Sequence, residues 1–347
     1  MGEVKVIDKE TGEVIGDFYE MFIDALRNGK KFKLEDKIVD GSIDILEIYE
    51  RIKSDEKLKK LITKKTVDMG IISIPTEIIE INIDVSINNV EFNGNFLLFK
   101  PWTDTESLEI TFKGKAYFMK SRFKRITDFT NSTFEKEANF MESTFEKDVN
   151  FKDSIFKERA CFIGSIFMRR ANFENSTFGG GVSFWYSKFK WDVIFENSEF
   201  KKIANFHGLT VEGKAKFNGA KFHGETYFTY SRFEKYVSFR GLKFKDINFN
   251  NSIFKERVYF THSTFEGNAD FSEIIYNLAI FYKSTFKSRA DFRDILFNLL
   301  SFIDCTFEDL ALFRKGKIKF ERYEKNRIDL KKPDKEEIHE IININKI

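Results

Sequence analysis

The chain has four histidines, the residue type most often used as a general base or a zinc ligand: His207, His223, His262 and His339. A zinc site needs several ligands to meet, and no two of these histidines lie at a spacing that would gather them. The first two directly follow a phenylalanine, and the third lies two residues after another. We interpret them as surface residues, and we predict no catalytic, cofactor-binding or metal-ligating residue.

The two cysteines, Cys161 and Cys305, would be nucleophiles only with a base beside the thiol. No base falls in register with either, so we interpret both as inert. Cys161 directly precedes Phe162 and is expected to point outward, whereas Cys305 lies two residues before Phe307 and is expected to point inward. Two cysteines make no disulfide framework, and nothing in the sequence suggests an oxidising compartment.

Two further groups of residues resemble chemical sites. The triplet Gly179-Gly180-Gly181 has the composition of a phosphate loop, but neither a helix nor a Lys-Ser/Thr pair follows it. A chain corner with tight backbone geometry is the better interpretation. The acidic pair Asp291 and Asp294 lies on a surface rich in both charges, which favours solvated carboxylates over a general acid and base. The sequence therefore predicts no active site, and an enzyme is the least favoured class.

Composition sets the broad class of the chain. Its 347 residues include 57 Lys+Arg and 55 Asp+Glu, a net charge of +2, which gives no preference for a nucleic-acid or an acidic partner. The first residues lack the apolar core of a signal peptide, and no run of apolar residues is long enough for a spanning helix. We therefore expect a cytoplasmic protein. The anomaly is 43 Phe beside 3 Pro and 3 Trp.

The phenylalanines follow a period that belongs to neither a helix nor a strand. Their spacing alternates between five and six residues, so that four steps take 22 residues. Steps of 22 connect four series, in which one position is filled by Val211: Phe129, Phe151, Phe173, Phe195, Phe217 and Phe239; Phe134, Phe156, Phe178, Phe200, Phe222 and Phe244; Phe140, Phe162, Phe184, Phe206 and Phe228; Phe145, Phe167, Phe189 and Phe233. Four columns with one common period predict a chain wound into a four-sided tube.

A small residue stands two positions before each Phe: Ser132, Ala138, Ser143, Val149, Ser154, Ala160, Ser165, Ala171, Ser176 and Val182. Strand side chains at i and i+2 share a face, so each side of the tube turns one short and one long side chain inward. After Phe239 the period falls to 21, which indicates that one corner of each coil has lost a residue and that the cross-section changes slightly. Each coil needs neighbours to complete its core.

Units such as Ala138-Asn139-Phe140, Ala171-Asn172-Phe173 and Ala290-Asp291-Phe292 resemble the A-(N/D)-(L/F)-x-x unit of pentapeptide-repeat proteins. The resemblance covers roughly residues 88–313 and implies an all-β fold, a right-handed quadrilateral parallel β-helix. The alternation of five and six residues and the preference for Phe over Leu depart from the plainest pattern, and imply larger corners and a fatter core. We expect a capping region of hairpin and helices over 1–87, the β-helix over 88–313 and a charged tail or capping helix over 314–347.

The ends of a β-helix expose unpaired strand edges that must be covered. Residues 4–15 predict a hairpin with a turn near Thr11-Gly12, and residues 17–28 predict a helix that Gly29 stops. Ser42 is expected to cap a second helix, and a third, basic helix is expected over 55–65. The alternating run from Ile79 is expected to start the first strands. The tail, with a helix expected from Asp334, would cap the last coil or pair with another chain in an end-to-end homodimer.

The leading hypothesis for function is a non-enzymatic scaffold that binds another protein, because repeat rods offer long surfaces without a natural cleft. The resemblance also implies a topoisomerase-binding DNA mimic, but residues 118–313 carry 29 basic and 25 acidic residues, the wrong sign for mimicry. Direct nucleic-acid binding through strips such as Lys120 to Arg125 or Arg169-Arg170 is disfavoured by the interleaved acids. Threonines such as Thr133, Thr144 and Thr177 directly precede column phenylalanines, but Ile155, Ile166, Lys188 and Glu199 interrupt the series, which disfavours ice binding. No membrane-spanning segment supports a regulatory domain of a membrane protein.

Overall fold

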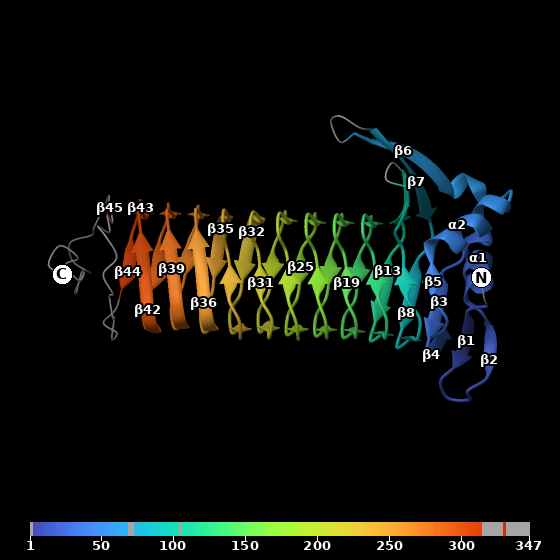
Figure 1. Cartoon of the computed structure of the whole chain (residues 1–347), viewed down its shortest axis with the longest axis horizontal. Helices are drawn as coiled ribbons and strands as arrows, with labels where there is room; N and C mark the ends of the chain where they lie inside the picture. The colour runs from blue at the N-terminus through green and yellow to red at the C-terminus, as the bar shows by residue number, and fades with distance from the viewer. Residues whose placement is uncertain (1–2, 69–72, 104–105, 314–328, 331–347) are drawn as a thin grey trace. The chain divides into compact units, whose positions relative to one another are not determined.

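The computed structural model describes residues 3–68, 73–103, 106–313 and 329–330 (Figure 1). Its contacts divide the chain into two compact units, residues 1–180 and 181–347, and each is described by itself. Within the described residues, no helix has the length and apolar character needed to cross a bilayer.

In the first unit, short parallel strands stack in four columns, as the phenylalanine period predicts. Two columns belong to one sheet: β4 (Lys37–Asp40), β9 (Glu91–Phe92), β14 (Arg122–Phe123), β18 (Thr144–Phe145) and β22 (Ile166–Phe167); β5 (Ile43–Asp44), β10 (Phe96–Leu97), β15 (Thr127–Asp128), β19 (Val149–Asn150) and β23 (Ala171–Asn172). Two belong to the other: β7 (Ser73–Ile81), β12 (Glu106–Phe112), β16 (Thr133–Phe134), β20 (Ile155–Phe156) and β24 (Thr177–Phe178); β3 (Phe32–Glu35), β8 (Val85–Asn88), β13 (Ala116–Met119), β17 (Ala138–Asn139) and β21 (Ala160–Cys161).

The second unit has a four-column pattern of the same kind. One sheet contains two columns that merge as the strands lengthen: β26 (Lys188–Phe189), β27 (Val193–Ile194), β30 (Thr210–Val211), β31 (Ala215–Lys216), β33 (Arg232–Phe233), β34 (Val237–Ser238), β36 (Ile253–Thr261), β39 (Ile275–Tyr282) and β42 (Leu296–Ile303). The other sheet contains the remaining two: β25 (Val182–Ser183), β28 (Glu199–Phe200), β29 (Ala204–Asn205), β32 (Lys221–Tyr227), β35 (Lys243–Asn248), β37 (Thr264–Phe265), β38 (Ala269–Asp270), β40 (Thr285–Phe286), β41 (Ala290–Phe292), β43 (Thr306–Phe307), β44 (Ala311–Phe313) and β45 (Asp329–Leu330).

Phenylalanine rings fill the interior of both units. The rings of Phe129 and Phe151 stack with centroids 4.9 Å apart and planes within 4°, and Phe173 stacks on Phe151 at 5.0 Å. All three are fully buried. The ring spacing follows from the distance between hydrogen-bonded parallel strands, about 4.8 Å. The predicted parallel β-helix with stacked aromatic columns is confirmed.

The alternation of five and six residues arises from two kinds of corner. The five-residue steps of the 22-residue coils, and those at the equivalent corners of the later coils, contain a residue with left-handed backbone two positions after their first Phe, φ between 50° and 70°: Lys120, Asn131, Glu142, Asp153, Gly164 and Asn175 in the first unit; Tyr186, Asn197, Gly208, Gly219, Tyr230, Gly241, Asn251, His262, Glu273, Lys283, Asp294 and Asp304 in the second. A left-handed residue reverses the chain in little length, so this corner needs one residue fewer than the other.

The shorter coils after Phe239 are built from strands that run straight through a corner. β35, β39 and β42 each span a step that has shortened from six to five residues. Where a six-residue step lies beside a five-residue step, the pairing slips once, between Phe222 and Glu225 on β32 and between Phe254 and Arg257 on β36. These bulges absorb the lost residue, as bulges do in other sheets.

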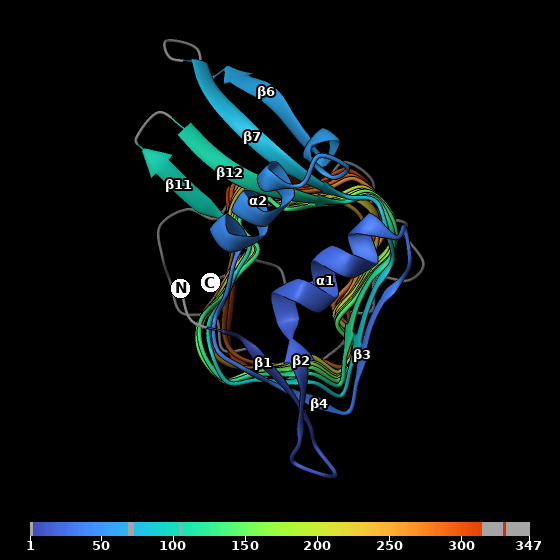
Figure 2. The same ribbon diagram turned by 90° about the vertical axis from the view of Figure 1, so that its right-hand side faces the viewer.

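The expected hairpin and first helix of the N-terminal region are present. β1 (Lys5–Asp8) pairs antiparallel with β2 (Val14–Asp17), and α1 (Phe18–Arg27) follows directly. Asp17 caps α1 by accepting the Glu20 N–H at 3.0 Å, and its second oxygen accepts the Val4 N–H at 2.8 Å. Phe18 and Phe22 of α1 pack on Phe32. The helix therefore covers the end of the coils in this unit (Figure 2).

Two predictions about the cap were wrong. The second helix, α2 (Ile45–Ser54), is capped by Asp44 rather than Ser42, because the Asp44 carboxylate accepts the Leu46 N–H. No helix forms over 55–65: one 3₁₀ turn (Lys59–Leu61) leads into β6 (Ile62–Asp68), which pairs antiparallel with β7. β-branched Ile and Thr in β6 favour a strand over a helix. The run from Ile79 begins inside β7, which starts earlier, at Ser73.

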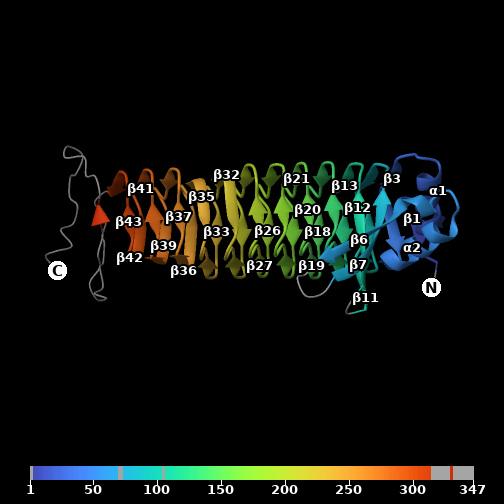
Figure 3. The same ribbon diagram turned by 90° about the horizontal axis from the view of Figure 1, so that it is seen from above.

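β6 and β7 belong to a small sheet that was not predicted. β7 also pairs with β12, and β12 pairs with β11 (Lys100–Thr103), giving the order β6-β7-β12-β11. This sheet stands out from the side of the coils of the first unit (Figures 2 and 3). In the second unit, β45 pairs with β43, and the tail helix expected from Asp334 lies outside the described residues.

Candidate functional site

The serines that stand two positions before a column Phe are buried, and most of them stabilise the fold through a hydrogen bond to another coil. In eight of them the hydroxyl donates to the carbonyl of a phenylalanine on the preceding coil, and Cys305 repeats the contact with its thiol, Sγ to Phe281 O at 3.3 Å. The serines, with distances of 2.7 Å for most, are: Ser143, Ser154, Ser165, Ser176, Ser231, Ser252, Ser263 and Ser284. A buried hydroxyl is stabilised when it is paired inside the core, and these eight serines meet that condition, whereas the buried Ser132 Oγ has no hydrogen-bond partner among the described residues.

The Asn or Asp directly before Phe has a structural role that sequence reasoning missed. Its side-chain oxygen accepts the backbone N–H two residues later, at 2.7–3.1 Å: Asp128, Asn139, Asn150, Asn172, Asn205, Asn248, Asp270 and Asp291. Such turns stabilise the left-handed corner that follows. The signal was present, because these residue types recur immediately before a column Phe and three residues before the left-handed position.

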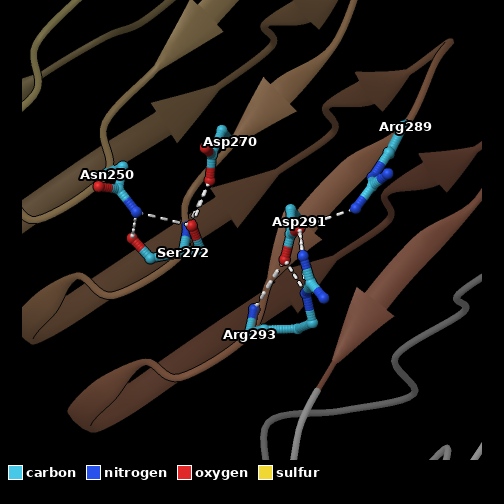
Figure 4. Close-up of polar contacts among 6 residues, drawn as sticks. All are labelled: Asn250, Asp270, Ser272, Arg289, Asp291 and Arg293. Atoms are coloured by element: carbon cyan, nitrogen blue, oxygen red, sulfur yellow. Dashed lines mark hydrogen bonds and ion pairs between the residues drawn. The ribbon is translucent and has the colours of Figure 1, made fainter.

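Figure 4 shows two of these Asp turns, at Asp270 and Asp291, with the side chains that bond to them. Asn250 Nδ2 donates to Ser272 Oγ at 2.9 Å, and Ser272 Oγ donates to Asp270 Oδ1 at 2.6 Å. On the next coil, Asp291 accepts from the Arg293 guanidinium at 2.6 Å and from Arg289 at 3.2 Å. The Asp291 carboxylate is therefore engaged on both oxygens. The Asn250–Ser272 contact joins neighbouring coils, and the Asp291 contacts stabilise the corner on their own coil.

The Asp291 cluster predicts a pH-dependent stability. Burial favours the neutral acid, but hydrogen bonds from the Arg293 side chain and backbone, and from Arg289, outweigh it and hold the pKa of Asp291 below its usual value. A depressed carboxyl pKa stabilises the fold above the unfolded-state pKa, and the contribution is lost as the pH falls through the folded-state value. Asp291→Asn keeps the turn oxygen, so it should cost about 1 kcal/mol at pH 7. Thermal unfolding should show this difference shrinking between pH 5 and pH 2; a constant difference would contradict it.

The structure places the three described histidines on separate corners. His207 Nδ1 lies 2.7 Å from Thr229 Oγ1, and His223 Nε2 lies 2.9 Å from Glu199 Oε1. His262 packs edge-on against Tyr282. His339 is outside the described residues. In the part of the chain that the structure describes, no three His, Cys, Asp or Glu side chains gather as metal ligands.

The cysteines differ from expectation in one respect. Cys305 is buried in the inward slot, as predicted, and burial raises the pKa of its thiol to about 11. Cys161, expected to point outward into water, is only 3% exposed. Burial raises the pKa of the Cys161 thiol as well. A raised pKa lowers the thiolate fraction, which leaves both thiols weak nucleophiles.

Two glycines of the triplet, Gly179 and Gly180, are required by close packing rather than by a left-handed backbone. A Cβ on Gly180 would lie 2.4 Å from the carbonyl carbon of Glu158, and one on Gly179 would lie 2.9 Å from Lys157 O. Both contacts are with backbone on the coil before, within the first unit. The predicted tight corner thus has a specific cause.

Exposed aromatic side chains gather at one corner of the second unit. Trp185 and Tyr186 follow β25, His207 follows β29 and Tyr230 follows β32; we call these four residues the aromatic corner. Ring centroids lie 5.4 Å apart for Trp185–Tyr186, 5.6 Å for Tyr186–His207 and 5.4 Å for His207–Tyr230. Trp185 is 42% exposed, and the two tyrosines are each 60% exposed.

The backbone holds these rings in a fixed order. The Tyr186 N–H donates to His207 O at 3.0 Å, and the Gly208 N–H donates to Thr229 O at 2.8 Å, so the corners stack in register. A Cβ on Gly208 would lie 2.4 Å from the Tyr186 ring. Glycine at this position therefore lets the Tyr186 ring lie over the backbone of the next coil.

The aromatic corner lies in a patch without formal charge. On four successive coils, the residue before the column Phe and the two after it are all neutral, in a chain that is 32% charged: Ser183, Trp185, Tyr186, Asn205, His207, Gly208, Tyr227, Thr229, Tyr230, Asn248, Asn250 and Asn251. Large exposed rings beside hydroxyl and amide groups favour contact with another molecule over simple solvation.

Comparison with known proteins gives two findings. A family model described as pentapeptide repeats (9 copies) matches residues 109–155, 195–243 and 228–275. An uncharacterised protein of Methanocaldococcus jannaschii is 39% identical over 102 residues, and the match spans 29% of this chain and 20% of that relative. No solved structure matches.

Proposed function

Because this chain is a pentapeptide-repeat protein, we propose that it is a non-enzymatic scaffold that binds another protein through the aromatic corner. The observation that supports the proposal is a set of exposed Trp and Tyr rings, held in register on stacked coils and free of charged neighbours at the corner itself. Asp291 and Cys305, two residues weighed above as catalytic candidates, form hydrogen bonds within the fold.

Protein partners suit this surface for energetic reasons. Trp and Tyr dominate the binding energy of protein interfaces, because they bury a large area at a small cost in side-chain entropy. The stacked corners hold the ring positions before binding, which lowers the ordering cost further. A patch without formal charge also escapes the penalty of burying unpaired ions.

The alternative functions have less support. A DNA mimic needs a strongly negative surface, whereas residues 118–313 carry a net charge of +4. Many of the acids there form ion pairs along the coils, such as Lys136–Glu158 at 3.0 Å and Lys157–Glu135 at 2.7 Å. Such alternating pairs also reduce the affinity of these faces for a nucleic-acid backbone.

Removing the aromatic corner should abolish partner binding. We expect the full chain, used as bait in native lysate, to retain a partner that Trp185→Ser/Tyr230→Ser loses by at least about 30-fold, because each ring is a candidate hot spot. The measurement is quantitative mass spectrometry of the captured proteins. Ile203→Ser is the matched control, since Ile203 is 50% exposed on another corner of the same unit, and it should retain the partner.

A partner retained equally by all three baits would contradict the proposed surface, as would retention of nucleic acid with no protein. Thermal unfolding of each bait separates loss of binding from loss of fold. The proposal includes a cytoplasmic setting, which the two free, buried cysteines support. End-to-end pairing of two chains depends on the tail and stays a separate proposal.

A further inference from the structure

A groove lies on the first unit where its N-terminal region meets the coils. Its volume is about 580 Å³. One wall comes from the start of the chain and the first coil, and the other from three successive coils: Ser42, Asn93, Gly94 and Asn95; Arg125, Ile126, Lys147, Asp148 and Arg169. None of these residues belongs to the aromatic corner.

Three cations line the groove at equivalent positions. Arg125, Lys147 and Arg169 are 22 residues apart, and the strands that follow them pair in register, Thr127 with Val149 and Val149 with Ala171. Their backbones therefore lie about 4.8 Å apart along the stack. Three like charges at this spacing repel one another unless an anion lies between them.

The described residues leave much of this charge uncompensated. The side chains of Arg125 and Lys147 make no ion pair with any described residue, whereas the adjacent Lys124 and Arg122 pair with Glu91 and Glu146. Asp148 is the carboxylate of the groove, and it lies 3.3 Å from the Arg170 guanidinium. Asp148 is thereby shared with a fourth cation, so the groove stays positive.

The opposite wall adds neutral donors. Ser42 Oγ accepts the Asn95 N–H at 3.1 Å, which leaves the Ser42 hydroxyl hydrogen able to donate. Asn95 Oδ1 accepts the Ile126 N–H at 3.2 Å, and within the described chain Asn95 Nδ2 has no hydrogen-bond acceptor. A Cβ on Gly94 would lie 2.2 Å from Gly41 O, so the backbone of this wall is closely packed and fixed.

We propose that this groove binds a compact ligand with two or more linked phosphate groups. Phosphate oxygens suit two guanidiniums, which donate in pairs, with an ammonium between them. The row of cations spans two coil spacings, about 10 Å, which fits a short phosphate chain and is too short for the length of a duplex. Linked phosphates occur in inorganic polyphosphate and in nucleotides, whereas the phosphates of a nucleic-acid strand are separated by sugars.

Calorimetric titration of the full chain tests the proposal. The probes are tripolyphosphate, ATP and a four-residue oligothymidylate, each at two salt concentrations. We expect saturable binding of tripolyphosphate or ATP, weakened about tenfold for each cation removed in Arg125→Gln and Arg125→Gln/Lys147→Gln. Lys136→Gln/Lys157→Gln is the matched control, because these exposed lysines lie on the same unit, and it should bind within twofold of the natural chain.

The pattern of the three probes identifies the source of the phosphate. Equal affinity for tripolyphosphate and ATP indicates recognition of the phosphate chain alone, and a preference for ATP indicates a nucleotide. The proposal is overturned if neither probe gives saturable binding, if the control variant loses as much affinity as the groove variant, or if the oligothymidylate alone binds. Ligand should also raise the unfolding temperature of the natural chain but not of the groove variant.

Discussion

Replacing Phe184 with Asp is expected to destroy the cooperative unfolding of the chain or to lower its stability by at least about 5 kcal/mol. Phe184 is fully buried and stacks on Phe206, with centroids 5.3 Å apart and planes within 2°. The Phe184 and Phe195 rings pack edge to face, with centroids 5.3 Å apart. Aspartate would leave a cavity among these rings and place a carboxylate where no donor can reach it.

Two comparison variants separate this effect from general sensitivity. Phe184→Leu keeps an apolar side chain of smaller volume and should cost about 1–3 kcal/mol. Glu174→Ala removes a half-buried side chain whose ion pair with Lys152 is 3.4 Å long, and it should change stability by about 0.5 kcal/mol or less. Chemical denaturation measures all three. A Phe184→Asp chain as stable as Glu174→Ala would show that the rings are not the core.

The core could be predicted because it repeats. A single Phe says little, but Phe129, Phe151 and Phe173 share a period that only a coil of fixed length can produce, and the structure stacks them. The same period placed Cys305 correctly in the inward slot. For Cys161 the period indicates only the face on which the side chain lies, and it does not show how much of that side chain is covered: Cys161 is 3% exposed.

The N-terminal region was harder to predict because nothing in it repeats. A basic helix was expected over 55–65, yet Lys64 and Lys65 lie on β6 and pair with acids of the same small sheet, Lys64 with Glu77 on β7 at 2.8 Å and Lys65 with Glu109 on β12 at 2.6 Å. Strand formation there depends on β7 and β12, which come later in the chain. Local propensity cannot show such partners in advance.

The two proposed surfaces were hidden for a similar reason. Trp185 and Tyr186 lie between the column residues Phe184 and Phe189, and the column pattern assigns no role to these two positions. Tyr186 contacts His207, and His207 contacts Tyr230. These contacts can be predicted only when the register of three successive coils is known. The groove combines Arg125 with Ser42, 83 positions earlier, and only the packing of the N-terminal region on the coils brings them together.

The central claim is that a chain of fixed coil length places the phenylalanines in four buried columns. Removing one whole coil tests it most directly. Deletion of residues 151–172 joins Asn150 to Phe173. In the intact chain Phe173 stacks on Phe151, and Asn150 pairs in register with Asn172, the residue before Phe173. Phe173 can therefore take the place of Phe151 one coil earlier. The matched control deletes residues 149–172, two residues more. The step from Phe145 to Phe173 is then four residues, whereas the natural step from Phe145 to Phe151 is six.

Thermal unfolding followed by circular dichroism is the measurement. We expect the 22-residue deletion to unfold cooperatively, with a stability lowered only by the share of one repeat. The 24-residue deletion should lose cooperative unfolding, because its chain is too short to turn the corner and place Phe173 on the next side. Equal behaviour of the two deletions, whether both folded or both unfolded, would contradict the four-column coil.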